Sequence, residues 1–198
     1  CDGLNMESSN GIGPSEISNF WLYANGGETF TAIVTNLDST SAGPRLQGRM
    51  YRNLYMSFWG LGMYQRGAWH TTYQSIRMNQ CYRGVEIQDQ NVKLLFNDIV
   101  MTRGTITGTG TTIGFQVGST GGPSSTRPED VFIQNSLIYG YEQGIYWRQC
   151  LFGGVLRCDL DAVGTDGIRV VTADGGFIVR DNWIQVIDNG GTYYGIIL

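Results

Sequence analysis

A glycine followed by an apolar residue recurs along most of the chain and gives a periodic hydrophobic pattern. The pairs are Gly62-Met63, Gly84-Val85, Gly114-Phe115, Gly144-Ile145, Gly167-Ile168 and Gly195-Ile196. Small turn-forming residues recur with nearly the same period, and each is followed three positions later by an apolar residue. They are Asn53, Ser75, Asn97, Asn135, Asp159 and Asp181. The most frequent step in this second series is 22 residues, which indicates a repeat.

Each repeat contains three short apolar runs separated by turns, with no room for a helix between them. In the unit that starts at Gly84 the runs are Val85–Ile87, Val92–Phe96 and Ile99–Met101. Such units predict an all-β fold, a parallel β-solenoid with three short strands in each coil of about 22 residues. Its coils stack at roughly 4.8 Å. An antiparallel sandwich is the alternative, but it gives no reason for a turn residue to return at this period.

The same alignment predicts the organisation of the chain. Residues 45–198 form the solenoid, and residues 1–44 form an N-terminal segment with one degenerate coil between Ile17 and Val34. The one long step between turn residues marks an inserted loop at residues 105–125, which is rich in Thr, Gly and Ser. Because Ile196–Leu198 read as the first strand of another coil, we expect the solenoid to continue beyond residue 198.

Composition supports this fold and narrows the possible partners. Gly accounts for 29 of 198 residues and charged residues for only 15 %, which argues against a helical bundle. The net charge is −4 and the 13 cations form no run, which argues against nucleic acid as a partner. No segment reaches about 18 consecutive apolar residues, so membrane insertion is not expected.

The four cysteines and the single histidine predict neither a metal site nor a cofactor. Cys1, Cys81, Cys150 and Cys158 share no Cys-x-x-Cys spacing, and His70 is the only histidine. The simplest interpretation is that the cysteines are buried free thiols in a protein that folds in a reducing cytoplasm.

Aromatic side chains are frequent in the repeats, and lysine is almost absent. The aromatic residues that stand out are Tyr64, Trp69, Tyr73, Tyr146, Trp147 and Trp183. Together with the three-strand coils, the Asx turns and the Gly-apolar strand starts, they make residues 45–198 resemble the right-handed parallel β-helix of the pectate-lyase-like group, in particular the tailspikes of bacteriophages. The resemblance implies a homotrimeric protein of the virion tail that contacts other tail proteins and folds in the host cytoplasm.

The resemblance also implies a function. Tailspikes of this kind bind, and often cleave, a bacterial surface polysaccharide such as a capsule or an O-antigen. A glycoside hydrolase is favoured over a polysaccharide lyase. Two alternatives stay open, namely a non-catalytic receptor-binding tail fibre protein and a secreted pectinase-like polysaccharide lyase.

Equivalent positions of stacked coils lie in straight columns, so the alignment predicts which outward side chains are neighbours. Two residues after each strand-start glycine the series is Tyr64, Glu86, Gln116, Tyr146, Arg169 and Ile197. Two residues further on it is Arg66, Gln88, Gly118, Arg148 and Val171. Such columns have the composition of a sugar-binding groove, although an ordinary solvated face would look similar. The expected substrate-binding residues are Tyr64, Gln88, Gln116, Tyr146 and Arg169.

Hydrolysis of a glycosidic bond requires two carboxyl groups that flank it. Glu86 is the main candidate because it is the only acid in the two outward columns. Its possible catalytic partners are Glu142 and Asp166, in the turns before that face, and Asp161 on the third strand. Asp159 holds a position of the repeating turn and is therefore expected to be structural.

Cleavage by β-elimination has different requirements, namely a cation that neutralises a uronate carboxylate and a base that removes a proton. Arg66 and Arg148 are candidates for the cation, and His70 is the candidate for the base. A lone histidine just past an outward strand also fits a surface or packing role.

A third outward column follows the turn residues by two positions. It consists of Tyr55, Arg77, Ile99, Leu137, Asp161 and Trp183. Several of these residues are apolar although they are expected to point outward, which predicts burial against a neighbouring subunit in the homotrimer. In that case the two catalytic groups can come from different subunits.

Overall fold

The computed structural model describes residues 4–6, 15–36, 46–88, 91–103, 111–118, 127–172, 175–187, 192 and 194–198. Within these residues there is no helix, and eighteen strands join in one sheet whose pairs are all parallel. The strands are β1 (Leu4–Met6), β2 (Ser15–Ser18), β3 (Trp21–Asn36), β4 (Leu46–Gln47), β5 (Arg49–Arg66), β6 (Ala68–Asn79), β7 (Arg83–Ile87), β8 (Val92–Thr102), β9 (Ile113–Val117), β10 (Glu129–Gln134), β11 (Leu137–Tyr139), β12 (Gln143–Trp147), β13 (Gly153–Leu156), β14 (Asp159–Val163), β15 (Asp166–Val170), β16 (Phe177–Arg180), β17 (Trp183–Val186) and β18 (Tyr194–Ile197).

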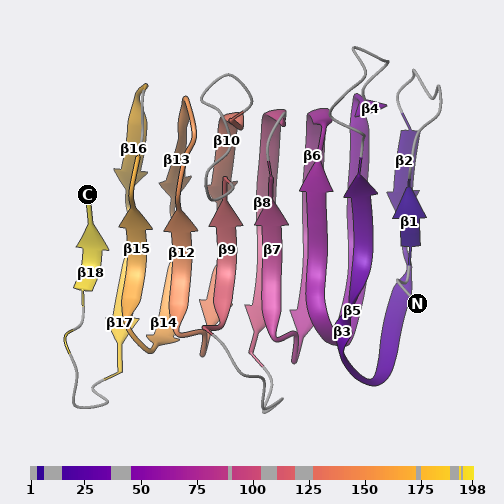
Figure 1. Ribbon diagram of the computed structural model, residues 1–198, viewed down its shortest axis with the longest axis horizontal. Helices are drawn as coiled ribbons and strands as arrows, with labels where there is room; N and C mark the ends of the chain where they lie inside the picture. Colours follow the sequence, from indigo (N-terminus) through magenta and orange to yellow (C-terminus); the bar gives the residue numbers. More distant parts are fainter. Residues whose placement is uncertain are drawn as a thin grey trace.

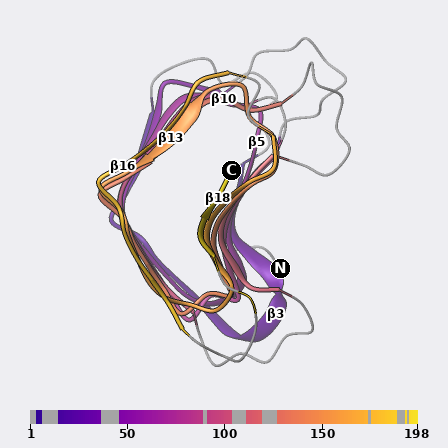
Figure 2. The ribbon, with the colours of Figure 1, turned by 90° about the vertical axis from the view of Figure 1, so that its left-hand side faces the viewer.

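The sheet winds around the molecule as a solenoid, and each coil contributes three strand segments (Figures 1 and 2). The first sheet contains β1, the ends of β3 and β5, and then β7, β9, β12, β15 and β18. The second contains β2, β4, the starts of β5, β6 and β8, and then β10, β13 and β16. The third contains the start of β3, the middle of β5, the ends of β6 and β8, and then β11, β14 and β17. The predicted all-β solenoid is confirmed.

The register of the first sheet agrees with the Gly-apolar series. The apolar residues of the six pairs stand opposite one another from coil to coil, in the order Met63, Val85, Phe115, Ile145, Ile168 and Ile196. The first five are buried and belong to the core. The series therefore marks the inward side of the first sheet, as periodic burial requires.

The glycines before these residues also lie above one another from coil to coil. They stand at the corner between the third and first sheets, where there is no space for a side chain. A Cβ atom at Gly144 would lie 2.6 Å from the carbonyl oxygen of Gly167 and 2.6 Å from Cδ2 of Leu160. The same crowding occurs at the equivalent glycines, Gly62, Gly84, Gly114 and Gly167. Core side chains of the third sheet thus pack directly on the backbone of the first sheet.

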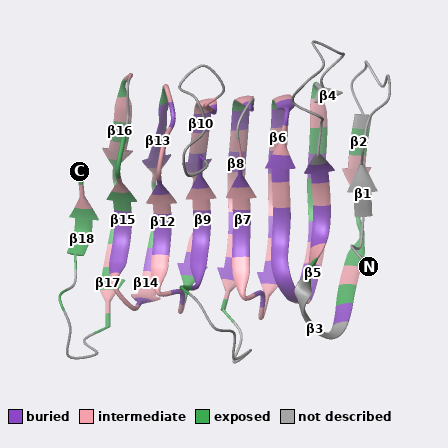
Figure 3. Cartoon of the chain, in the orientation of Figure 1, coloured by how far each residue is buried: buried purple, intermediate pink, exposed green. Residues whose placement is uncertain are grey.

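Aromatic rings stack in the interior of the second sheet and extend toward the first. The ring centroids of Tyr51 and Tyr73 are 5.0 Å apart with the planes at 13°, and those of Tyr73 and Phe96 are 4.3 Å apart at 4°. Phe115 meets Phe96 edge to face at 5.2 Å. The stack follows from the parallel register, which places the inward residue of each coil above that of the last. Figure 3 shows that buried residues run through the coils from β5 to β15.

Left-handed backbone conformations mark the turn between the second and third sheets. The residues are Asn19, Asn53, Ser75, Asp98, Asn135, Arg157 and Asp181. The predicted series is wrong at two of its six positions, because the turn residues are Asp98 instead of Asn97 and Arg157 instead of Asp159. Asn97 is the last residue before the turn, and Asp159 is already the first residue of β14. A carboxylate or amide side chain therefore does not by itself identify the turn position.

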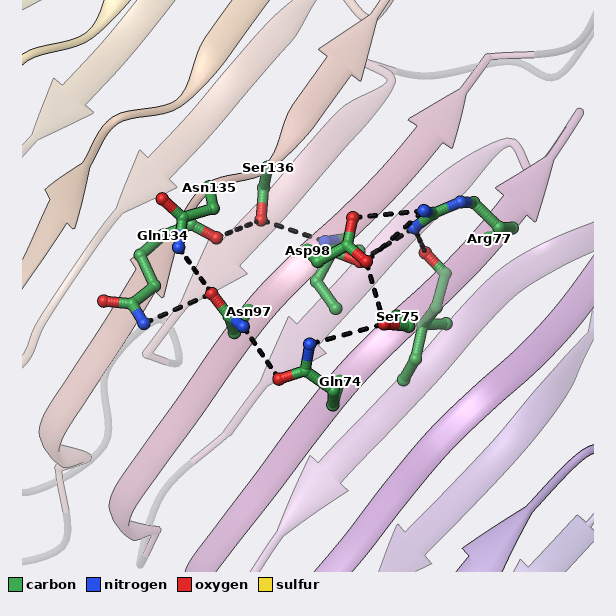
Figure 4. Close-up of polar contacts among 10 residues, drawn as sticks. Gln74, Ser75, Arg77, Asn97, Asp98, Gln134, Asn135 and Ser136 are labelled. Carbon is green, nitrogen blue, oxygen red and sulfur yellow. Dashed lines mark hydrogen bonds and ion pairs between the residues drawn. The ribbon is translucent and has the colours of Figure 1, made fainter.

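Side chains beside this turn link successive coils (Figure 4). Nδ2 of Asn97 donates a hydrogen bond to Oε1 of Gln74 on the preceding coil at 2.7 Å. Oδ1 of Asn97 accepts hydrogen bonds from Nδ2 of Asn135 at 2.7 Å and from Nε2 of Gln134 at 3.2 Å on the following coil. Asn97 thus bridges three coils, although it is not the turn residue.

The outward column of the third sheet differs from the prediction as a result of these shifts. It consists of Trp21, Tyr55, Arg77, Val100, Leu137, Asp159 and Trp183. Val100 occupies the place predicted for Ile99, which instead is fully buried in the core. Asp159 occupies the place predicted for Asp161. The column is apolar at both ends, where Trp21 and Trp183 are exposed.

Parts of the predicted insertion and of the N-terminal segment lie outside the described residues, namely 105–110 and 119–125, and 1–3, 7–14 and 37–44. Between the two parts of the insertion, β9 pairs with β7 and β12 and so holds the regular place of a first-sheet strand. Within the described residues, no helix has the length and hydrophobicity that a membrane crossing requires.

Three cysteines are buried free thiols, and Cys1 lies outside the described residues. Burial raises the pKa of Cys81 and of Cys150 to about 12. The pKa of Cys158 is raised to about 11 for the same reason.

Candidate functional site

The outer face of the first sheet carries the polar columns that the sequence predicts. One column is Tyr64, Glu86, Gln116, Tyr146, Arg169 and Ile197, each in register with the next. Arg66, Gln88, Gly118 and Arg148 follow two residues later along the same coils. Figure 2 shows that this side of the cross-section, where β5 and β18 are labelled, curves inward. The five residues expected to bind substrate thus share one concave face, and their role in binding stays a prediction.

Glu86, the main catalytic candidate from the sequence, is held by two donors. Nε2 of Gln88 donates a hydrogen bond to Oε1 of Glu86, and the guanidinium of Arg83 lies 3.1 Å from Oε2. The Glu86 side chain is 14 % exposed. The two donors engage both carboxyl oxygen atoms and hold the Glu86 side chain in one orientation.

Tyr146 orients two arginines near the middle of the same face. The Cζ atom of Arg148 lies 5.1 Å from the ring centroid of Tyr146, and that of Arg169, on the next coil, lies 5.7 Å from it. Cation–π attraction of this kind holds a guanidinium group against the ring. The aromatic side chain therefore fixes two positive charges close together.

A pocket of about 880 Å³ shares Arg169 with this cluster. Its walls come from the turns before β12 and β15 and from β18, and include Glu142, Gln143, Thr165, Asp166 and Tyr194. Two of the expected catalytic acids, Glu142 and Asp166, therefore face one pocket. They stand on adjacent coils, because the amide of Thr165 donates to the carbonyl oxygen of Glu142 at 2.7 Å.

The two acids of the pocket have different surroundings. Asp166 has a side chain only 7 % exposed, and its Oδ2 lies 3.4 Å from the guanidinium of Arg169 and 3.2 Å from Nε2 of Gln143. Oε2 of Glu142 accepts a hydrogen bond from the amide of Thr112 at 2.8 Å. Within the described part of the chain, Oε1 of Glu142 has no donor. Asp166 is therefore fixed by two donors to one oxygen atom, whereas Glu142 is held by the single donor to Oε2.

Other candidates from the sequence lie apart from the pocket. Asp161 is in β14 of the third sheet, opposite Tyr139. His70 is exposed in β6 of the second sheet, where its left-handed backbone conformation is shared by the equivalent residue Lys93. Arg66 ends β5 on the first sheet, three coils from Arg148. Among the described residues, no group of three or more His, Cys, Asp or Glu is placed to hold a metal ion.

Apart from Asp166, the residues that directly precede the strand-start glycines were not recognised in the sequence. They form a column of their own, in the order Leu61, Arg83, Ile113, Gln143, Asp166 and Tyr194. Arg83 holds Glu86, and Gln143 holds Asp166. The sequence contains the signal that identifies this column, because each of its residues stands directly before the glycine that starts a first-sheet strand.

Two ion pairs of this face join the same two columns with opposite polarity. On the β7 coil the cation is Arg83 and the acid is Glu86, three residues later. On the β15 coil the acid is Asp166 and the cation is Arg169, again three residues later. The backbone of the face thus accepts either sign of charge at either position.

Comparison with known proteins gives one relative in sequence. No family model matches the chain. Over 170 residues, or 83 % of this chain, the sequence is 21 % identical to the tail spike protein of Shigella phage Sf6. The resemblance to phage tail spikes is confirmed. The match spans 27 % of the length of that tail spike protein.

A solved structure, the catalytic domain of a GH87 alpha-1,3-glucanase in complex with tetrasaccharides, was also matched. The match covers 98 % of this chain and 61 % of the glucanase chain, at 10 % identity and a TM-score of 0.23. At that TM-score the likeness carries no inference about this chain, and the fold rests on the strand pairing described above.

Proposed function

We propose that this chain is part of a protein of the phage virion tail that binds a bacterial surface polysaccharide, a capsule or an O-antigen, and depolymerises it. The resemblance to a tail spike protein supports the tail location. The concave face of the first sheet supports a glycan ligand, because tyrosines, amides and arginines suit sugar rings and hydroxyl groups. The observation that carries the proposal is the pocket that Glu142 and Asp166 line together from adjacent coils.

The reaction in this proposal is hydrolysis of a glycosidic bond. Asp166, held in place by Arg169 and Gln143, acts on the anomeric carbon, either directly or through a water molecule. Glu142 carries a proton on Oε1 and gives it to the glycosidic oxygen as that bond breaks. A separation of about 5–5.5 Å between the carboxyl groups gives retention of configuration, and about 6.5–9.5 Å gives inversion.

Glu86 binds substrate in this proposal and does not cleave it. The coil of β9 lies between Glu86 and Tyr146, and Glu86 does not line the pocket. Because Arg83 and Gln88 keep its carboxylate in place, Glu86 accepts hydrogen bonds from sugar hydroxyl groups. Arg66 donates to the same chain of sugars further along the face.

The test uses the longest natural protein that contains this chain, incubated with capsular and O-antigen polysaccharides of its host. We expect reducing ends to appear without the ultraviolet absorbance of unsaturated uronates. Glu142→Gln and Asp166→Asn should each slow cleavage by about 10²–10⁴-fold while glycan binding is kept. The matched controls, Glu129→Gln and Asp181→Asn, make the same chemical changes away from the pocket and should cleave at the normal rate.

Other results would change the assignment. Normal cleavage by both pocket variants, together with loss of cleavage in Glu86→Gln, would move the reaction to Glu86. If reducing ends and unsaturated uronates rise together, the reaction is an elimination, and Arg66, Arg148 and His70 become the residues to test. Binding without either signal would make this a non-catalytic receptor-binding protein. Cleavage of pectin in place of host glycans would favour a secreted pectinase-like lyase.

We also propose that three copies of the full protein associate through the third sheet and join other proteins of the tail. The outward column of this sheet has the exposed tryptophans Trp21 and Trp183 at its ends and Val100 and Leu137 near its middle. Apolar side chains of this kind are covered by subunit contacts, although the charged residues Arg77 and Asp159 also belong to the column. The buried free thiols fit folding in the host cytoplasm. Sedimentation equilibrium of the full protein tests the trimer, and a monomer mass would overturn it.

A further inference from the structure

The strongest unexplained feature of the candidate face is the concentration of positive charge at Tyr146. Arg148 and Arg169 both place a guanidinium group within 6 Å of the centroid of one ring. They come from different coils, since Tyr146 and Arg169 are register partners in β12 and β15. Two like charges held this close repel each other unless an anion compensates them.

Among the described residues, a carboxylate pairs with one of the two guanidinium groups and not with the other. Arg169 contacts Asp166 at 3.4 Å, whereas no carboxylate of the described residues lies within ion-pair distance of Arg148. The neighbours of Arg148 in its own column are Gly118 and Val171, which carry no charge. The site therefore has a positive charge that the described part of the chain leaves for a ligand.

The chemistry of the two side chains suits a carboxylate as the anion. A guanidinium group stacked against an aromatic ring keeps its plane and presents its N–H edge, which matches the two oxygens of a carboxylate. Tyr146 thus acts as a positioning residue whose ring attracts both guanidinium groups. A carboxylate placed between them gains charge-assisted hydrogen bonds from two sides.

We propose that Tyr146, Arg148 and Arg169 form a subsite for an acidic sugar, whose carboxylate binds between the two guanidinium groups. This inference rests on the proposed function, because it names the chemical class of the bound polysaccharide. Arg169 also lines the pocket of Glu142 and Asp166, so the acidic sugar lies next to the bond that is cleaved.

The test measures binding of the full protein to a uronate-containing capsular polysaccharide and to the same polysaccharide after its carboxyl groups are reduced to alcohols. We expect reduction to weaken binding by about tenfold or more. Arg148→Gln should weaken binding of the acidic form by a similar factor and leave binding of the reduced form unchanged. Arg180→Gln removes the same charge from the second sheet and is the matched control, with normal binding of both forms.

A second variant separates charge from geometry. Arg148→Lys keeps the charge but loses the planar pair of donors, so it should recover only part of the binding that Arg148→Gln loses. Circular dichroism of each variant checks that the fold is intact.

The outcomes distinguish the two proposals. Equal binding of the acidic and reduced forms, unaffected by Arg148→Gln, would overturn the acidic subsite and leave the proposed function in place. Preference for phosphate-bearing over uronate-bearing polysaccharides would also overturn it, because the site would then select a tetrahedral anion and not a planar carboxylate. Absence of binding to every acidic and neutral surface polysaccharide would overturn the proposed function together with the subsite.

Discussion

The glycine ladder shows how single atoms limit what each coil can contain. At Gly144 a methyl group would contact the backbone of the next coil and a leucine of the core at 2.6 Å each. Backbone cannot move aside as a flexible side chain can. We therefore expect Gly144→Ala to lower the free energy of unfolding by about 1–3 kcal/mol, measured by denaturant titration.

Gly176 provides the matched control for this prediction. A Cβ atom there would have its nearest neighbour, Cδ1 of Phe152, at 3.9 Å, which is ordinary contact. Gly176→Ala should therefore change the free energy of unfolding by no more than about 0.5 kcal/mol. Equal losses in both variants would mean that the corner relaxes and that crowding does not explain the ladder.

The identity of single turn and site residues was harder to predict from the sequence than the columns of the sheet. The columns of the first sheet were predicted correctly because a glycine stands at the same position in six successive coils, and at five of these positions a Cβ atom would clash. The turn was misplaced at two residues for a physical reason. Asn97 and Asp98 suit a left-handed turn equally well, and Arg157 adopts that conformation although its side chain gives no sign of it. Arg83 and Gln143 were missed because their importance comes from acids that fold beside them.

Strands are joined into coils by side-chain ladders as well as by backbone hydrogen bonds. Asn97 in β8 is bonded to Gln74 in β6 and to Gln134 and Asn135 at the end of β10. Removing its amide breaks three hydrogen bonds, two of them to the partly buried side chains of Gln74 and Gln134. We expect Asn97→Ala to lower the free energy of unfolding by about 1–2 kcal/mol.

The control for this prediction is Gln185→Ala in β17, which removes an exposed amide of the same chemistry. Chemical denaturation of both variants, with hydrogen exchange of the β8 and β10 amides, compares the two sites. If hydrogen exchange is faster across the whole solenoid and not only near β8, the ladder stabilises the molecule globally. Unchanged stability in Asn97→Ala would show that water replaces the three hydrogen bonds of Asn97 without loss of stability.

At the scale of elements, the sequence predicts which segments are strands and how they stack better than it predicts the site. Stacking requires equivalent inward residues in every coil, so the pattern is repeated and can be recognised. The pocket is made once, where Glu142 and Asp166 meet on neighbouring coils, and no repeat marks it. The acids were named from the sequence, but their joint pocket required the fold.

The interior of the whole molecule buries thiol and phenol groups, and these make the free energy of unfolding depend on pH above about pH 9. Burial raises the pKa of Cys81 and Cys150 from 9.0 to about 12, and raises that of Tyr73 and Tyr141 well above 10.0. Above pH 9 the unfolded chain loses protons that the folded chain retains, so unfolding becomes more favourable as pH rises. The stability is fully present below pH 9 and falls toward pH 12.

Each such group contributes up to about 1.4 kcal/mol per pH unit within that window. Denaturation midpoints measured from pH 7 to pH 11 check the prediction. Cys150→Ala removes one titrating group, so its stability should fall less steeply with pH than that of the native chain. A flat profile up to pH 11 would contradict the burial of these groups.

The reversed ion pairs of the first sheet bear on how a protein of this kind changes over generations. Arg83 with Glu86, and Asp166 with Arg169, show that two exchanges of charge need no adjustment of the scaffold beneath them. Substitutions at these outward positions can therefore change the charge of the face and leave the scaffold as it is. The inward residues that specify the solenoid are separate from these positions, so the charge of the face and the fold are set by different residues.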